Sequence, residues 1–179
     1  MSKILIIVGS ARRGGNTEQL AHAFARGAEA AGNEVVTLSV ADLAVKPCVG
    51  CNACSRREGN TCFQDDDMSI VYRHLASADT LVLATPVYFY GISAQLKTLV
   101  DRLHTPLRNT FPLRRMALLA VGASSRPELF DAIMMQYRLV LGYFHLEDVG
   151  TVLVHGMKER GDIAASPALD EACRLGRSL

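Results

Sequence analysis

Five short apolar segments recur along the chain, and each is followed by a stretch whose apolar residues have helical spacing. They cover 3–9, 34–39, 80–85, 116–121 and 149–154. The first, KILIIVG, is apolar almost throughout, which is typical of a strand covered on both faces. The intervening stretches predict helices over 16–31, 67–76, 93–103, 128–144 and 167–177. Strands that alternate with helices in this way indicate a parallel sheet with helices on both faces.

The order of the strands follows from how parallel strands can be connected. Right-handed crossovers leave few ways to wind five of them. We therefore predict a three-layer α/β/α fold with the flavodoxin-like strand order 2-1-3-4-5 and with ligands at the carboxyl ends of strands one, three and four. The 179 residues fit one domain over 1–179, with an irregular cysteine-rich loop at 46–66. Asp67 is the expected N-cap of the second helix.

Charge and hydropathy exclude several classes of partner. The formal net charge is +1 and the basic pairs are scattered, so we expect no nucleic-acid partner. The apolar run at the start is too short for a signal peptide, and no stretch is long enough to span a bilayer. We therefore expect a cytoplasmic protein with no membrane partner, in which the five cysteines stay reduced.

The segment 9–17, GSARRGGNT, joins the first strand to its helix, where doubly wound folds bind phosphate. Glycines let the backbone approach an anion, Ser10, Asn16 and Thr17 offer polar donors, and Arg12 adds a permanent charge. The lysine of a P-loop and the glycine spacing of a dinucleotide loop are both absent. A monophosphate dianion is therefore the preferred ligand. The alternative is a tight turn that Asn16 caps.

The segment 85–93, TPVYFYGIS, follows the third strand and carries three successive aromatic residues. An isoalloxazine ring needs apolar or aromatic contacts on its faces, and a proline-fixed turn beside the phosphate site would supply them. The alternative is that these aromatic residues form a core plug or a subunit contact.

Both segments resemble one branch of the flavodoxin-like proteins, the NAD(P)H-dependent FMN reductases and iron–sulfur flavoproteins. The phosphate loop of that branch typically begins with glycine, serine, any residue and arginine, and ends with glycine, asparagine and threonine. It is matched by Gly9, Ser10, Arg12, Gly15, Asn16 and Thr17. Its flavin loop is matched at 86–88, 93–97 and 101–102, and the resemblance covers most of 3–102.

The resemblance implies FMN as the cofactor and assigns its contacts. The implied phosphate ligands are Ser10, Arg12, Gly15, Asn16 and Thr17. The implied neighbours of the isoalloxazine ring are Pro86, Val87, Tyr88 and Phe89. A third contact is expected at the end of the fourth strand, by position only, at Gly122, Ala123 and Ser124.

Cys48, Cys51, Cys54 and Cys62 are separated by two, two and seven residues. Such cysteines can converge in an irregular loop around a metal centre, and their run resembles 4Fe–4S ligation by four thiolates. A zinc site usually has two separate C-x-x-C pairs, and a redox dithiol needs only two cysteines. The family has a compact motif of this form followed by Asp-Asp-Met, matched at 66–68, which implies a 4Fe–4S cluster. The alternative is a metal-free loop that is redox-sensitive or structural.

These features predict an FMN-dependent redox protein that passes electrons between a 4Fe–4S cluster and FMN, with a ferredoxin-like carrier as partner. The first alternative is a cluster-free reductase that uses NAD(P)H to reduce FMN, quinones or nitroaromatics. The second is a non-enzymatic domain that binds a phosphate ligand or a protein partner. No catalytic side chain is required, because flavin performs the chemistry. The resemblance also implies a homodimer or homotetramer, and the polar loop 155–162 has no assigned role.

Overall fold

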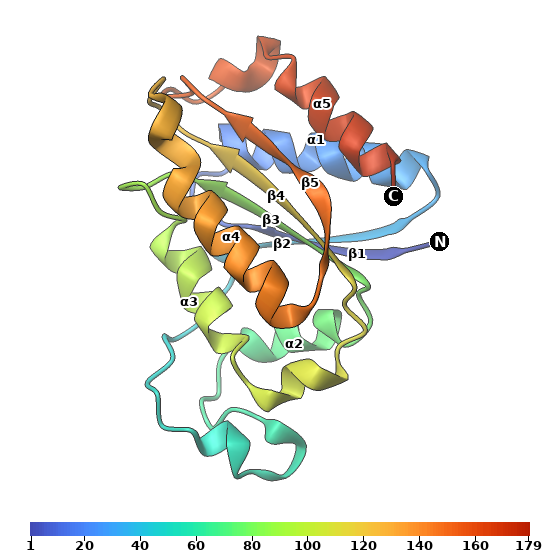
Figure 1. Ribbon diagram of the computed structural model, residues 1–179, viewed down its shortest axis with the longest axis vertical. Helices are drawn as coiled ribbons and strands as arrows, with labels where there is room; N and C mark the ends of the chain where they lie inside the picture. The colour runs from blue at the N-terminus through green and yellow to red at the C-terminus, as the bar shows by residue number, and fades with distance from the viewer.

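A five-stranded parallel sheet lies between two layers of helices in the computed structural model, which describes residues 1–179 (Figure 1). The strand order is β2-β1-β3-β4-β5, so the predicted fold class and topology are confirmed. The strands are β1 (Lys3–Val8), β2 (Glu34–Ser39), β3 (Thr80–Pro86), β4 (Arg115–Val121) and β5 (Glu147–Val154).

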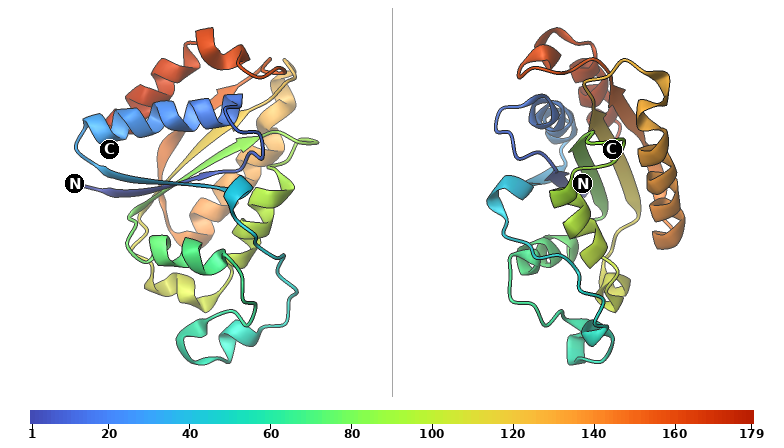
Figure 2. Two further views of the ribbon diagram at one scale, coloured as in Figure 1. Left: turned by 180° about the vertical axis from the view of Figure 1, so that it is seen from behind. Right: turned by 90° about the vertical axis from the view of Figure 1, so that its left-hand side faces the viewer.

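The helices cover both faces of the sheet (Figure 2). Helices α1 (Asn16–Ala30) and α5 (Ala168–Arg177) lie on one face. The other face is covered by α2 (Met68–Leu75), α3 (Ala94–Arg102) and α4 (Asp131–Phe144). Alternate residues of β1 belong to the two apolar cores, Ile4 and Ile6 to the first and Leu5 and Ile7 to the second. This explains why β1 is apolar at nearly every position. None of the helices combines the length and apolar character needed to cross a membrane.

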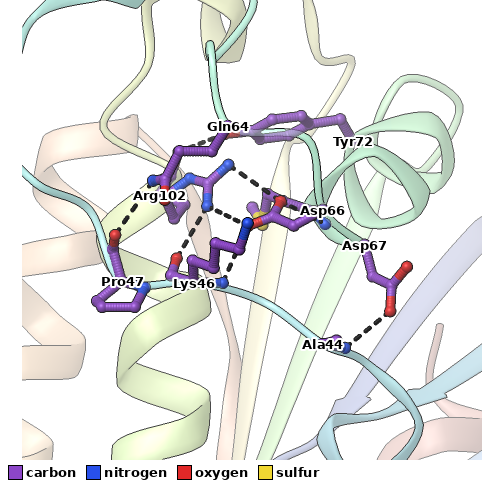
Figure 3. Close-up of polar contacts among 9 residues, drawn as sticks. Ala44, Lys46, Pro47, Gln64, Asp66, Asp67, Tyr72 and Arg102 are labelled. Atoms are coloured by element: carbon purple, nitrogen blue, oxygen red, sulfur yellow. Dashed lines mark hydrogen bonds and ion pairs between the residues drawn. The ribbon is translucent and has the colours of Figure 1, made fainter.

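Two local predictions need correction. The helix expected over 128–144 begins as a 3-10 turn, Pro127–Phe130, and becomes α-helical only at Asp131. Asp67 is the N-cap residue of α2, as predicted, but its side chain makes no capping hydrogen bond. Its Oδ2 accepts instead from the Ala44 backbone N–H at 2.7 Å, while Asp66 Oδ1 accepts from Met68 N–H at 3.1 Å (Figure 3). Asp67 thus holds the segment that follows β2 in place through Ala44.

Helices α1 and α5 pack side by side at two glycines. A Cβ atom at Gly27 would lie 1.9 Å from the Cys173 carbonyl oxygen, and one at Gly176 would lie 2.1 Å from the Phe24 carbonyl oxygen. Because backbone atoms lie on both sides of each contact, neither glycine could be replaced by alanine without separating the helices.

We predict that Gly27→Ala lowers the free energy of unfolding by about 1–3 kcal/mol, the range for overpacking a close contact. The matched control is Gly142→Ala in α4, because a Cβ atom there meets nothing within 4 Å. That variant should gain about 0.5–1 kcal/mol from the better helix propensity of alanine. Urea unfolding of both variants measures the difference, and a Gly27→Ala variant as stable as the wild type would contradict the packing described.

Candidate functional site

A cavity of about 270 Å³ opens at the carboxyl edge of the sheet, the edge at which open parallel sheets bind ligands. The loops after β1, β3, β4 and β5 contribute to it. Its lining residues are Ser10, Arg12, Gly15, Asn16, Thr17, Pro86, Val87, Tyr88, Val121, Ala123, Met157, Lys158 and Arg160. The structure therefore brings together all the predicted phosphate-loop residues and most of the predicted flavin neighbours. Phe89, Gly122 and Ser124 do not line the cavity.

One end of the cavity is formed by the first turn of α1. The N–H groups of a first helical turn have no carbonyl partner within the helix, and the helix dipole makes this end positive. Ser10 and Thr17 are only 5% and 3% exposed, so their hydroxyl groups lie within the fold beside this turn. Backbone amides, hydroxyl groups and positive potential at one place are the features that bind a phosphate.

Three cations line the same cavity: Arg12, Lys158 and Arg160. None of them forms an ion pair within the chain. Arg13 differs, because it pairs with Glu18 and Asp42 and does not line the cavity. The site therefore keeps positive charge available for an anionic ligand.

The loop after β5 is fixed to the first turn of α1 by the Asn16 side chain. Asn16 Nδ2 donates to the Glu159 carbonyl oxygen at 2.8 Å, and Oδ1 accepts from the N–H groups of Gly161 at 2.9 Å and Ile163 at 3.4 Å. Arg160 Nε adds a 3.3 Å hydrogen bond to the Gly14 carbonyl oxygen. The side chain of Asn16 is thus occupied by this loop, and its backbone N–H is the group left for a ligand.

Met157, Lys158 and Arg160 are site residues that the sequence analysis missed. The prediction placed ligands after strands one, three and four, whereas the loop after β5 also reaches the cavity. The available signal was its position, because every parallel strand ends at the same edge of the sheet.

The loop after β3 ends in a tight turn. Tyr88 and Gly91 exchange two backbone hydrogen bonds of 3.0 Å, and Phe89 and Tyr90 between them have φ of +51° and +65°. Bulky residues rarely adopt this left-handed conformation, which suits glycine or asparagine. The turn projects from the sheet edge (Figure 1). Phe89 is fully exposed at its tip, whereas Pro86, Val87 and Tyr88 line the cavity.

Ser93 joins the loop after β1 to the loop after β3. Its buried hydroxyl group donates to the Gly9 carbonyl oxygen at 2.6 Å and accepts from Leu96 N–H at 3.2 Å, which caps α3. A Cβ atom at Gly9 would lie 2.9 Å from Leu96 Cβ and 3.1 Å from the Ala84 carbonyl oxygen. Glycine at this position lets β1 end in close contact with both β3 and α3.

Gly122 and Ser124 hold the loop after β5 instead of lining the cavity. The Gly122 carbonyl oxygen accepts from Met157 N–H at 2.9 Å, and the Ser124 carbonyl oxygen accepts from Gly156 N–H at 3.3 Å. A Cβ atom at Gly122 would lie 2.4 Å from Leu129 Cδ2. Ala123, between them, does line the cavity.

A second cavity, of about 100 Å³, contains all four clustered cysteines. It lies in the segment 46–66, which we call the cysteine lobe. This lobe extends beyond α2 and carries two 3-10 turns, Ala53–Ser55 and Glu58–Asn60 (Figures 1 and 2). Cys48 and Cys51 are exposed and Cys54 and Cys62 half-buried, all as free thiols. No three His, Cys, Asp or Glu side chains lie close enough together to hold a metal ion. The cysteines thus share a cavity without the geometry of a formed metal site.

A buried ion pair attaches this lobe to the domain (Figure 3). Arg102 Nη1 lies 2.8 Å from Asp66 Oδ2, and the two side chains are 2% and 3% exposed. Burial acts to raise the pKa of Asp66, but hydrogen bonds from Arg102 and from two backbone N–H groups outweigh it and lower the pKa. The Tyr72 hydroxyl group donates to the Arg102 carbonyl oxygen at 2.7 Å, and burial raises the pKa of Tyr72 to about 12.

Comparison with known proteins agrees with this arrangement. The family described as NADPH-dependent FMN reductase matches residues 2–159. An iron–sulfur flavoprotein of Methanocaldococcus jannaschii is 41% identical over 124 residues, which are 68% of this chain and 63% of that protein. The chain therefore matches less than two thirds of the length of that relative.

Two further proteins match along nearly the whole chain. A Bacillus subtilis protein named as an NAD(P)H-dependent FMN-containing oxidoreductase is 29% identical over 97% of this chain and 96% of its own. The solved structure of an NAD(P)H:quinone oxidoreductase from Methanothermobacter marburgensis aligns with a TM-score of 0.81 at 17% identity and covers 98% of both chains. At that identity the structural match establishes the fold.

We predict that Asn16→Ala increases amide exchange in the loop 156–163 by about fivefold, because an intramolecular hydrogen bond contributes a net ~1 kcal/mol. Hydrogen–deuterium exchange of the protein prepared without added flavin measures the effect. The control is Asn109→Ala, at an exposed position outside the cavity, which should leave this loop unchanged. Equal exchange in the wild type and Asn16→Ala would show that Asn16 does not hold the loop.

Proposed function

The chain belongs to the NADPH-dependent FMN reductase family, and from this we propose that it is an oxidoreductase that binds FMN at the carboxyl edge of its sheet. One observation carries the proposal. The cavity there is lined by three cations and the first turn of α1 and, from the loop after β3, by Pro86, Val87 and Tyr88. FMN has the same division, with a dianionic phosphate at one end and an aromatic ring system at the other.

The donors present suit the phosphate of FMN. We assign the phosphate to the first turn of α1, with the hydroxyl groups of Ser10 and Thr17 and the guanidinium of Arg12 as its polar contacts. Lys158 and Arg160 add positive charge from the loop after β5. The isoalloxazine ring would lie along the loop after β3, where Tyr88 offers an aromatic surface.

When bound, FMN supplies hydride and single-electron chemistry, and the protein supplies binding and orientation. The proposed electron donors and acceptors are small molecules, with NAD(P)H among the donors. Three successive exposed aromatic residues at the tip of the loop after β3, Tyr88, Phe89 and Tyr90, support a homodimer or homotetramer. The proposed location is the cytoplasm, where thiols stay reduced.

The second part of the proposal is a 4Fe–4S cluster bound by Cys48, Cys51, Cys54 and Cys62. All four thiols line one cavity, and a relative that is 41% identical over 124 residues is named an iron–sulfur flavoprotein. A loop with little regular structure can take its ligating geometry when the metal binds, because metal binding is coupled to folding. With a cluster bound, a ferredoxin-like carrier is the proposed partner.

A cluster-free NAD(P)H-dependent reductase of FMN, quinones or nitroaromatics is the second candidate. One observation favours it: the B. subtilis relative, which matches this chain along nearly its whole length, is named as an NAD(P)H-dependent FMN-containing oxidoreductase. A non-enzymatic phosphate- or partner-binding domain fits the family less well.

We predict that Arg12→Ala raises the dissociation constant of FMN by about 10- to 100-fold, because a hydrogen bond to a charged group contributes ~1.5–3 kcal/mol. Affinity for riboflavin, which lacks the phosphate, should not change. Arg13→Ala is the matched control, since Arg13 lies outside the cavity. If Arg12→Ala weakened riboflavin as much as FMN, the assignment of the phosphate end would be wrong. Flavin fluorescence titration gives both constants.

The two candidate functions differ in iron content and electron donor. We expect protein prepared without oxygen to contain FMN and about four irons with matching sulfide per chain. Its flavin absorbance should then bleach with reduced ferredoxin. Flavin without iron, bleached rapidly by NAD(P)H, would establish the cluster-free reductase instead. Failure to retain or take up FMN would contradict both.

A further inference from the structure

We infer that Arg102 is a positioning residue for the sulfur centre of the cysteine lobe, with one edge of its guanidinium group donating N–H to a sulfur atom there. The inference rests on the cluster proposed above. It concerns a residue at the end of α3, outside the cysteine loop itself.

The donors of Arg102 can be accounted for one by one. A guanidinium group has five N–H donors in a fixed plane. Nη1 donates to Asp66 Oδ2 at 2.8 Å and to the Lys46 carbonyl oxygen at 2.9 Å, and Nη2 donates to Asp66 Oδ1 at 3.3 Å. Nε is buried and has no hydrogen-bond partner. Nε–H and the second N–H of Nη2 point along one edge of the plane, so this edge is open while the edge facing Asp66 is filled.

An open edge in a buried position requires an explanation. The side chain of Arg102 is 2% exposed, so water does not replace the missing acceptor readily. A buried donor without a partner costs about 1–3 kcal/mol, and folded proteins leave few of them. The ion pair with Asp66 explains why an arginine is buried here, but it does not explain the unpaired Nε.

The cavity beside Arg102 is the one that contains the four cysteines. Arg102 itself lines this cavity, together with Cys54 and Cys62. A cluster at this position would present thiolate and sulfide sulfur atoms. These atoms would accept the hydrogen bonds for which the open edge of Arg102 has no partner.

Such a contact would act on the reduction potential. Hydrogen bonds to the sulfur atoms and the charge near a cluster are among the factors that set its potential. Reduction adds one negative charge, so an N–H donor and a fixed cation favour the reduced state and raise the potential. A purely structural Arg102, which only joins the lobe to α3 through Asp66, would leave the potential unaffected.

The test compares Arg102→Lys with Arg108→Lys in the full chain, reconstituted with iron and sulfide without oxygen. Lysine at 102 keeps the positive charge but lacks the open guanidinium edge. Arg108 lies outside the cysteine cavity, over the ring of Tyr143, and provides the same change as a control. We expect the midpoint potential of the cluster to become more negative only in Arg102→Lys, with that of FMN unchanged. An iron-loaded Arg102→Lys protein with the wild-type cluster potential would overturn the inference.

A second measurement needs no variant at residue 102. Wild-type protein labelled with ¹⁵N in the arginine guanidinium groups should show a ¹⁵N coupling in pulsed EPR of the reduced cluster. A loaded cluster without that coupling overturns the role of Arg102 and leaves the cluster proposal standing. Wild-type protein that binds no iron overturns the cluster proposal and the role of Arg102 together, so the two failures are distinguishable.

Discussion

The backbone of Gly9 lies so close to α3 and β3 that no side chain fits between them. Its N–H donates to the Ala84 carbonyl oxygen and its carbonyl oxygen accepts from Ser93, each at 2.6 Å. These contacts fix the point at which the chain leaves β1, and they tie it to the start of α3. One glycine and one buried hydroxyl group therefore hold the loop after β1 and the aromatic loop at the same cavity.

The domain keeps its two candidate sites apart and builds them differently. At the sheet edge, four strand ends supply a cavity whose parts are held by backbone geometry and by Asn16. The cysteine lobe has little regular structure and is attached through the buried Arg102–Asp66 pair. Removing one partner of such a pair is costly, because the other charge stays buried. The first site is thus built into the sheet, whereas the second depends on a few contacts at the base of a loop.

Much of this could be predicted from the sequence. Apolar runs covered on both faces and the handedness of crossovers predict the sheet, and the positions of glycine, hydroxyl and arginine residues predict that the loop after β1 lines the cavity. The loop after β5 could not be found in this way, because its role depends on tertiary hydrogen bonds with Asn16 that have no local pattern. The position of Phe89 outside the cavity could not be predicted either, because aromatic residues give no sequence signal for a left-handed turn. Asp67 does occupy the predicted N-cap position, but its side-chain partner, Ala44, is distant in sequence and could not be predicted.

The central claim is that the cavity at the carboxyl edge of the sheet holds FMN, and a crystal structure of the protein grown with FMN tests it most directly. The account predicts the phosphate at the first turn of α1, in contact with Ser10, Arg12 and Thr17, and the ring system against the loop that carries Tyr88. FMN bound elsewhere, or this cavity left without flavin at saturating FMN, would contradict it.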